Sequence, residues 1–138
     1  MGYVLEKKFE YKGYLCAVCI MDLGHRCGYV GVPKNNKYYG VAYHDMAICT
    51  HGGLTYSGGN SDYPIKEDND LWWFGWDYAH YMDAKDEEAY IRYFGREHYE
   101  KHSCLFYGNS GTVYFLDDVE ADCKSVVEQL IELEGINE

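Results

Sequence analysis

The sequence predicts an α+β fold: an antiparallel or mixed sheet of four to six strands packed by a long C-terminal helix and a shorter helix. Two observations predict it. Runs of aromatic and β-branched residues alternate with glycine-containing turns over residues 9–77, whereas apolar residues recur at three-to-four spacing over residues 118–134. With 138 residues, of which 47 % are hydrophobic, we expect one domain spanning residues 1–138.

Most of the strands are predicted in the first half of the chain, where Tyr, Val and Ile are enriched. The turn between the first two contains Gly24, and the third is interrupted by the Gly52-Gly53 pair, which indicates a bulge or a close approach of the backbone. A polar loop over 34–44 and an acidic, turn-rich loop over 57–70 separate the later strands. The predicted strands cover residues 9–20, 27–32, 47–56 and 71–77, with a short one at 111–115.

Two helices complete the prediction. Acidic residues from Asp83 to Asp86 can cap a helix over 87–99, in which aromatic residues form a partial apolar face. The second helix, over 118–134, has acidic residues in its first turn, where the helix dipole favours them, and Gly135 at its C-terminal stop position. We expect this long helix to pack on the core.

The strand over 71–77 ends in ionisable residues. If it is extended, Trp73 and Asp77 share one face and Phe74 and Trp76 the other, so both faces are covered. Asp77 ends the strand, and His80 and Asp83 follow within six residues. If the segment carrying His51 lies beside them, these groups converge at the rim of a hydrophobic sheet, where burial shifts pKa values.

This cluster has two interpretations that stay open. A ligand-binding pocket would be built from Arg26, His51, Thr55, Trp73, Asp77 and His80, together with nearby tyrosines. A small metal-dependent hydrolase would instead use His51, Asp77, His80 and Asp83 to hold a divalent metal with an open position, or as an acid/base pair. The same residues could also only tie down loops, because buried polar groups are paired whatever their role.

The charge of the chain limits its partners. The formal net charge is −11, and the residues after position 50 carry all of the excess negative charge. An acidic surface repels phosphate backbones, so we expect no direct binding of nucleic acid, whereas a basic protein partner is allowed. A third interpretation follows: an acidic inhibitor that mimics nucleic acid, using the carboxylates between residues 62 and 88 and the C-terminal helix.

Cysteine and tyrosine usage gives further expectations. No signal peptide or membrane-spanning run is recognised, so we expect a cytoplasmic protein, in the host-cell cytosol if it comes from a phage, with no membrane contact. The six cysteines are then interpreted as free, mostly buried small hydrophobes. Loop tyrosines are typical of ligand pockets and protein interfaces. Those in predicted loops or strand ends are Tyr38, Tyr39, Tyr43, Tyr56, Tyr63, Tyr78 and Tyr81.

Several segments resemble a family of short, uncharacterised bacteriophage and prophage proteins. They are residues 28–33 (GYVGVP), 51–58 (HGGLTYSG), 72–83 (WWFGWDYAHYMD) and 119–130 (VEADCKSVVEQL), of which HGGLT and W-x-G-x-D-x-A-H are the most specific. The resemblance covers roughly residues 25–130 and implies a phage setting but no mechanism. Small phage accessory proteins often disable a host defence component or sequester its nucleotide signal.

The leading hypothesis is therefore an accessory binding protein of phage type. We expect it to counteract host defence by binding a host protein or by sequestering a small nucleotide-like ligand, and to form a homo-oligomer. The metal-dependent hydrolase and the acidic mimic are the alternatives.

Overall fold

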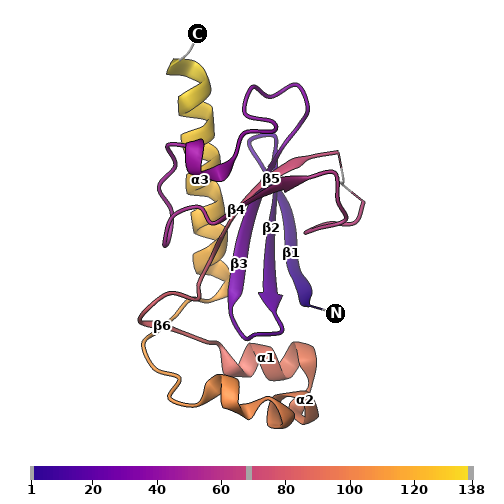
Figure 1. Ribbon diagram of the computed structural model, residues 1–138, viewed down its shortest axis with the longest axis vertical. Coiled ribbons are helices and arrows are strands. Elements are labelled where there is room, and N and C mark those ends of the chain that lie inside the picture. The colour runs from indigo at the N-terminus through magenta and orange to yellow at the C-terminus, as the bar shows by residue number, and fades with distance from the viewer. Residues whose placement is uncertain (1, 68–69, 137–138) are drawn as a thin grey trace.

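A five-stranded antiparallel sheet forms the centre of the protein in the computed structural model, which describes residues 2–67 and 70–136 (Figure 1). The strands lie side by side in the order β1-β2-β3-β5-β4, so β1 and β4 are the two edges. Their bounds are β1 Tyr3–Tyr11, β2 Tyr14–Met21, β3 Arg26–Val32, β4 Tyr56–Gly59 and β5 Trp72–Asp77. The predicted α+β class and the predicted range of strand number are confirmed.

The helices cover one face and one end of this sheet. The long C-terminal helix runs along the sheet, and the shorter helices lie beyond the turn that joins β2 to β3 (Figure 1). The short strands β6 and β7 pair in parallel, and this pairing connects the segment before α1 to the segment before α3. The bounds are α1 Glu87–Phe94, α2 Arg96–Lys101, α3 Leu116–Ile136, β6 Asp83–Ala84 and β7 Thr112–Val113, with short 3₁₀ turns at Tyr43–Asp45 and Ser103–Phe106.

The first strand differs from the prediction. The segment predicted as one strand over 9–20 contains the tight turn Lys12-Gly13, at which β1 turns back into β2. Both turn residues have positive φ, +48° and +84°, which is the geometry that two-residue hairpin turns require. Glycine at the second position makes this turn inexpensive, and it therefore overrides the continuous strand propensity around it.

Glycines explain two further differences, and a third concerns a glycine that does not act as predicted. Residues 47–55 form no strand, because Gly52 and Gly53 have φ values of +68° and +79° and turn the chain before β4 begins at Tyr56. The predicted helix over 87–99 is divided at Gly95, whose φ of +93° ends α1 and starts α2. Gly135 does not stop α3, which continues to Ile136.

Two hydrophobic cores lie on the two faces of the sheet. The larger one packs α3 against β2, β3 and β5, and the smaller one lies under the loop that contains Tyr63 and Ile65. Cys16 belongs to the first core and Cys19 to the second, as expected for residues three apart in a strand. Cys27 and Cys123 are also buried, whereas Cys49 and Cys104 are exposed, and all six thiols are free.

Among the described residues, no helix combines the length and apolar character needed to cross a membrane.

Candidate functional site

The candidate site begins where β5 leaves the sheet. Phe74 and Trp76 face α3 and Trp73 faces the opposite side, which confirms the predicted alternation. Tyr78 continues on the α3 side: its hydroxyl accepts a hydrogen bond from Trp76 Nε1 at 2.9 Å and donates one to Asp122 at 2.5 Å. Burial raises the pKa of Tyr78, and the Asp122 carboxylate raises it further. This buried chain of hydrogen bonds fixes the backbone just before the ionisable residues.

His51 reaches this place from the loop before β4. Its Nε2 lies 2.7 Å from Oδ2 of Asp83. The imidazole stacks on the ring of Tyr78, with centroids 4.6 Å apart, and packs against Tyr114 at 4.5 Å. The Asp83 carboxylate is almost fully buried. The His51–Asp83 pair is therefore largely buried, and the rings of Tyr78 and Tyr114 pack on its imidazole.

A second imidazole–carboxylate pair lies beside the first. Nε2 of His80 is 3.2 Å from Oδ1 of Asp77, and Oδ2 of Asp77 accepts a hydrogen bond from the Thr55 hydroxyl at 2.9 Å. Oδ1 of Asp77 also accepts from the backbone N–H of Ala79 at 3.1 Å. The backbone N–H of His80 donates to Oδ2 of Asp83 at 3.0 Å, which joins the two pairs into one network.

Gly52, the first of the paired glycines, lies against this network. A Cβ atom at Gly52 would lie 2.2 Å from Nε2 of His80, so only glycine allows the turn to rest on the imidazole. Nε2 of His80 is buried there without an aligned hydrogen bond. The paired glycines were predicted to allow a close approach to the backbone, and the group that approaches Gly52 is the imidazole of His80.

The four predicted residues His51, Asp77, His80 and Asp83 thus converge, with the two imidazole centroids 5.8 Å apart. Within residues 2–67 and 70–136, however, no group of three or more His, Cys, Asp or Glu side chains is arranged to hold a metal ion. Both oxygens of Asp77 and Oδ2 of Asp83 already accept hydrogen bonds from neighbouring groups. The geometry gives no support to the proposed set of metal ligands.

Two residues of the predicted ligand pocket lie elsewhere. Trp73 is only 1 % exposed and belongs to the core on the other face of the sheet, because side chains alternate along β5. Arg26 lies at the start of β3 and points toward α1, where it is buried in a separate network. Thr55, His51, Asp77 and His80 are the members of the predicted pocket that do meet.

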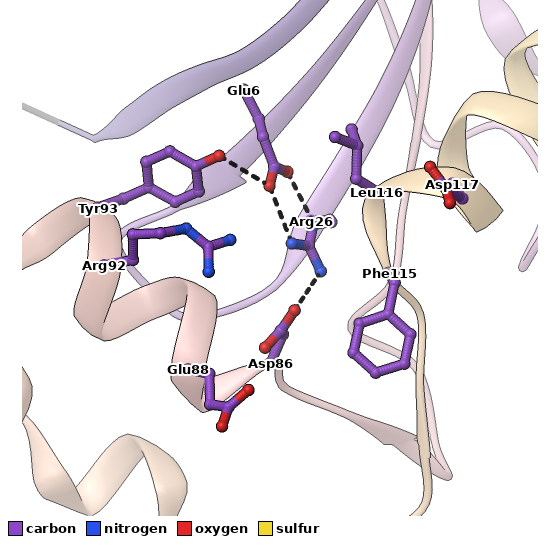
Figure 2. A pocket seen from close by; sticks show the side chains of 9 residues that line it. All are labelled: Glu6, Arg26, Asp86, Glu88, Arg92, Tyr93, Phe115, Leu116 and Asp117. Atoms are coloured by element: carbon purple, nitrogen blue, oxygen red, sulfur yellow. Dashed lines mark hydrogen bonds and ion pairs between the residues drawn. The ribbon is translucent and has the colours of Figure 1, made fainter.

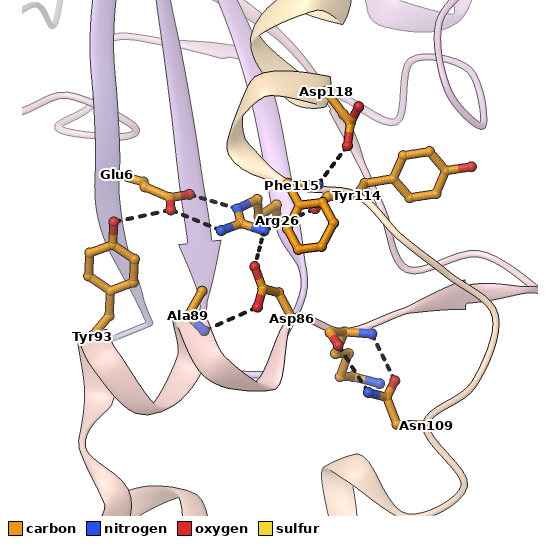
Figure 3. A network of polar contacts seen from close by, with 10 residues as sticks. Glu6, Arg26, Asp86, Ala89, Tyr93, Asn109, Tyr114, Phe115 and Asp118 are labelled. Atoms are coloured by element: carbon orange, nitrogen blue, oxygen red, sulfur yellow. Dashed lines mark hydrogen bonds and ion pairs between the residues drawn. The ribbon is translucent and has the colours of Figure 1, made fainter.

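Arg26 joins three parts of the chain (Figure 3). Its Nε and Nη2 atoms donate to the two oxygens of Glu6 at 2.7 and 2.9 Å. Its Nη1 atom donates to Asp86 and to the backbone carbonyl of Tyr114, both at 2.9 Å. Although burial alone lowers the pKa of Arg26, the hydrogen bonds and charges of Glu6 and Asp86 raise it overall. The guanidinium is therefore permanently charged and already satisfied.

A hollow of about 290 Å³ lies beside this network, between the sheet, α1 and the start of α3 (Figure 2). Its walls carry four carboxylates and two guanidinium groups, so they are negative overall. The charged lining residues are Glu6, Arg26, Asp86, Glu88, Arg92 and Asp117. A phosphate would meet repulsion here, and Arg26 has already directed its charge at two carboxylates. The hollow gives no support to capture of a nucleotide-like ligand by Arg26.

The two residues between His80 and Asp83 in the chain project into solvent. Tyr81 is 94 % exposed and Met82 is 61 % exposed, and Met82 has a φ of +73°. The backbone of this Tyr81–Met82 tip is fixed on both sides: the carbonyl of Met82 accepts from Thr112 N–H at 2.9 Å, and Asp83 N–H donates to the carbonyl of His80 at 3.0 Å. The tip is therefore an exposed apolar pair on a pinned backbone.

Sequence reasoning placed Tyr81 among seven loop tyrosines without distinguishing it. The structure separates them. Tyr56 and Tyr63 pack edge to face in the smaller core, and Tyr78 is buried beneath His51. Tyr38 and Tyr39 pack against the larger core, and Tyr43 is exposed to 36 %. Of the seven, only Tyr81 is almost completely exposed.

His25 belongs to the surroundings of the site and was not among its predicted residues. Burial lowers the pKa of this imidazole, while the nearby Asp77 carboxylate acts in the opposite direction. The register of β3 with β5, which aligns Cys27 with Asp77, brings the turn that contains His25 close to the end of β5. No spacing in the sequence could indicate this proximity, because it depends on strand pairing.

Comparison with known protein families, with curated proteins and with solved structures finds no match to this chain. The resemblance to phage and prophage proteins therefore stays a prediction.

Proposed function

We propose that this protein is a non-enzymatic binding protein that docks on a partner protein through the Tyr81–Met82 tip. One observation carries the proposal: a tyrosine that is 94 % exposed and a methionine that is 61 % exposed stand next to each other on a backbone held from beneath by a polar network.

The chemistry of the two side chains suits an interface. Tyrosine buries a large area at a low cost in rotamer entropy and keeps a hydroxyl for one directed hydrogen bond. Methionine adapts its shape to irregular apolar surfaces. Aromatic residues in the middle of an interface frequently contribute most of its binding free energy.

The support beneath the tip lowers the cost of binding. The carboxylate of Asp83 holds both His51 and the backbone of His80, and Asp77 holds Thr55 and His80. A loop that is already ordered loses little conformational freedom when a partner binds. The positive φ of Met82 is an uncommon conformation for a non-glycine residue, and such conformations cluster at functional sites.

The charge of the chain favours a basic partner. At −11, the protein attracts a positively charged surface from a distance and repels an acidic one. The resemblance to phage proteins would make that partner a host protein, bound in the cytosol to counteract defence. Sequestration of a nucleotide-like ligand has less support, because the hollow beside Arg26 is negative and Arg26 is already paired.

The two alternatives depend on other features. A hydrolase needs an accessible acid/base pair or metal, whereas His51 is held by the almost fully buried Asp83 carboxylate and Nε2 of His80 is buried against Gly52. An acidic mimic needs the carboxylates but not Tyr81. Substitution of Tyr81 therefore distinguishes the tip from mimicry.

A photo-crosslinking experiment tests the proposal. A photoreactive phenylalanine derivative in place of Tyr81 should capture a protein from a bacterial lysate, whereas the same group in place of Tyr107 should not capture it. Tyr107 is the matched control because it is 93 % exposed and lies in another loop. The captured protein is then purified, and its affinity for the unmodified chain is measured.

The expected result is that Tyr81→Ala weakens binding at least about tenfold, whereas Tyr107→Ala changes it by less than about twofold. Equal affinities for the two variants would refute docking by the tip. Loss of affinity on charge neutralisation alone, with no effect of Tyr81→Ala, would favour the acidic mimic.

A further inference from the structure

Two histidines lie next to each other at the end of α2. His98 is inside the helix, and His102 follows its last residue, four positions after His98. Residues four apart in a helix share one face. Their imidazole rings accordingly stack, with centroids 4.2 Å apart and an angle of 26° between the ring planes. This pair belongs to the helices beyond the turn that joins β2 to β3, and not to the candidate site (Figure 1).

A hydrogen bond determines which nitrogen of His102 is available. Nδ1 of His102 lies 2.9 Å from the backbone carbonyl oxygen of His98. A carbonyl oxygen only accepts, so Nδ1 carries the proton, and the lone pair of the neutral ring is on Nε2. Histidines that bind metals commonly donate from the second ring nitrogen to an oxygen in this way. Nε2 of this exposed residue is therefore the atom that can bind an ion.

The imidazole of His98 is oriented by packing. Its ring lies nearly parallel to the rings of both Phe94 and His102, and the centroids of Phe94 and His98 are 5.6 Å apart. Among residues 2–67 and 70–136, no group forms a hydrogen bond or an ion pair with the ring nitrogens of His98. The half-buried ring therefore has a fixed orientation and keeps its lone pair for a ligand.

The spacing of the two rings matches the size of a metal ion. A bond between a metal ion and an imidazole nitrogen measures about 2.0–2.1 Å, so two such bonds span at most about 4 Å. The 4.2 Å between the ring centroids is close to this span, and a tilt of the exposed His102 ring brings both nitrogens to one ion. Zinc-binding helices use the same spacing of two histidines four residues apart.

We propose that His98 and His102 together bind one divalent transition-metal ion of the zinc, nickel or copper type. Imidazole nitrogen suits these ions, whereas Mg²⁺ and Ca²⁺ prefer oxygen ligands. Among the residues that the structure describes, no third His, Cys, Asp or Glu side chain is arranged to hold the ion with them, so water completes the coordination. The net charge of −11 attracts cations, and the end of a helix favours positive charge.

A bound ion stabilises a weak element of the fold. The helix α2 has six residues, none of which is buried, and no side chain caps its N-terminus. Helices of this length are marginal by themselves, because few hydrogen bonds offset the cost of nucleation. An ion held by residues four apart closes the last turn, so metal binding and helix formation favour each other. The inference stands apart from the proposed function, because it involves α2 and not the Tyr81–Met82 tip.

Isothermal titration of the full chain with Ni²⁺ tests the site. Ni²⁺ is the probe because it does not oxidise the free thiols, and one ion should bind per chain. His98→Ala and His102→Ala should each weaken the binding at least about tenfold, because a single imidazole loses the advantage of two linked ligands.

Two variants control for other donors. His44→Ala removes an exposed imidazole elsewhere in the chain, and Cys104→Ser removes the exposed thiol two residues after His102. Each should change the affinity for Ni²⁺ by less than about twofold. Thermal unfolding without metal verifies that all four variants keep the fold.

Hydrogen exchange of the α2 amides gives a second measurement. Saturating Ni²⁺ should slow this exchange in the unmodified chain and not in His102→Ala, whereas Mg²⁺ should slow it in neither. The proposal is overturned if the chain binds no Ni²⁺, or if neither histidine variant weakens the binding. It is also overturned if Cys104→Ser or His44→Ala weakens the binding as much as the loss of His98 does.

Discussion

The polar networks around Arg26 and around Asp83 both connect distant parts of this chain, and they differ in how much water reaches them. Arg26 is 4 % exposed and binds a Glu6 carboxylate that is still more buried. In the other network, the His80 and Asp77 side chains are 37 % and 25 % exposed. The first joins β1, β3, α1 and the segment before α3, whereas the second joins loops around the end of β5.

The difference indicates different roles. A guanidinium stays charged at every physiological pH, so the Arg26 network is a permanent structural connection. The network that contains the two imidazoles supports an exposed loop rather than the core. The buried Arg26 network therefore stabilises the fold, whereas the more exposed network positions the Tyr81–Met82 tip in solvent.

The largest expected effect comes from removing the buried guanidinium. Arg26→Ala leaves the carboxylates of Glu6 and Asp86 without their cation, and we expect a loss of about 3–5 kcal/mol in the free energy of unfolding. Urea denaturation measures it. Arg92→Ala, which removes an exposed guanidinium from the same hollow, should cost less than about 0.5 kcal/mol. Similar losses for the two variants would remove the distinction between buried and exposed charge.

A smaller loss is expected from the second network. Asp83→Ala removes the acceptor of both His51 Nε2 and the His80 N–H, and should cost about 1–3 kcal/mol. It should also release the tip, so chymotrypsin should cleave after Tyr81 faster than in the unmodified chain. Asp45→Ala, at an exposed carboxylate 3.9 Å from His44, is the control and should change neither property. Unchanged cleavage at Tyr81 would argue against a supporting role for Asp83.

The pH dependence of stability sharpens the comparison further. Because burial lowers the pKa of His25, the unfolded chain binds this proton more readily than the folded one. The contribution of His25 to stability is therefore fully present above its unfolded pKa of about 6.5 and is lost as the pH falls below it. His25→Gln should flatten the fall in melting temperature between about pH 7 and pH 5. His44→Gln, at an exposed imidazole, should not, and equal slopes for all three proteins would contradict this assignment.

The smallest effect is expected at the tip itself. Tyr81 and Tyr107 are exposed to 94 % and 93 %, so alanine at either position should change the free energy of unfolding by less than about 0.5 kcal/mol. Urea denaturation of the two variants checks this. A large loss at Tyr81 alone would show that the tip contributes to the fold, and would weaken its assignment as a surface for a partner.

Much of the site was predictable because it lies in one short segment. The alternation of Trp73 and Phe74 on opposite faces, and the ionisable residues that follow Asp77, can be read from spacing alone. The approach of His51 was predicted on the condition that its segment lies beside the strand over 71–77. The strand expected around the paired glycines was wrong, since their positive φ values make a turn that rests on His80.

The place of Arg26 was not predictable in the same way. Its partners Glu6 and Asp86 lie 20 and 60 residues away in the chain. Glu6 reaches it through a bulge in β1, and no local pattern in the sequence marks which residue a bulge will displace. The exposure of Tyr81 depends likewise on the pairing of β6 with β7, two strands of only two residues each.

By itself, the sequence determined the α+β class, the amphipathic C-terminal helix and the two-faced β5 strand, because these follow from periodicities of two and 3.6 residues that act within a few neighbours. Only the tertiary structure decided which carboxylate holds which cation and which tyrosine meets solvent. Those outcomes depend on strand register and on contacts between residues far apart in the chain, where a shift of one residue reverses the face on which a side chain lies.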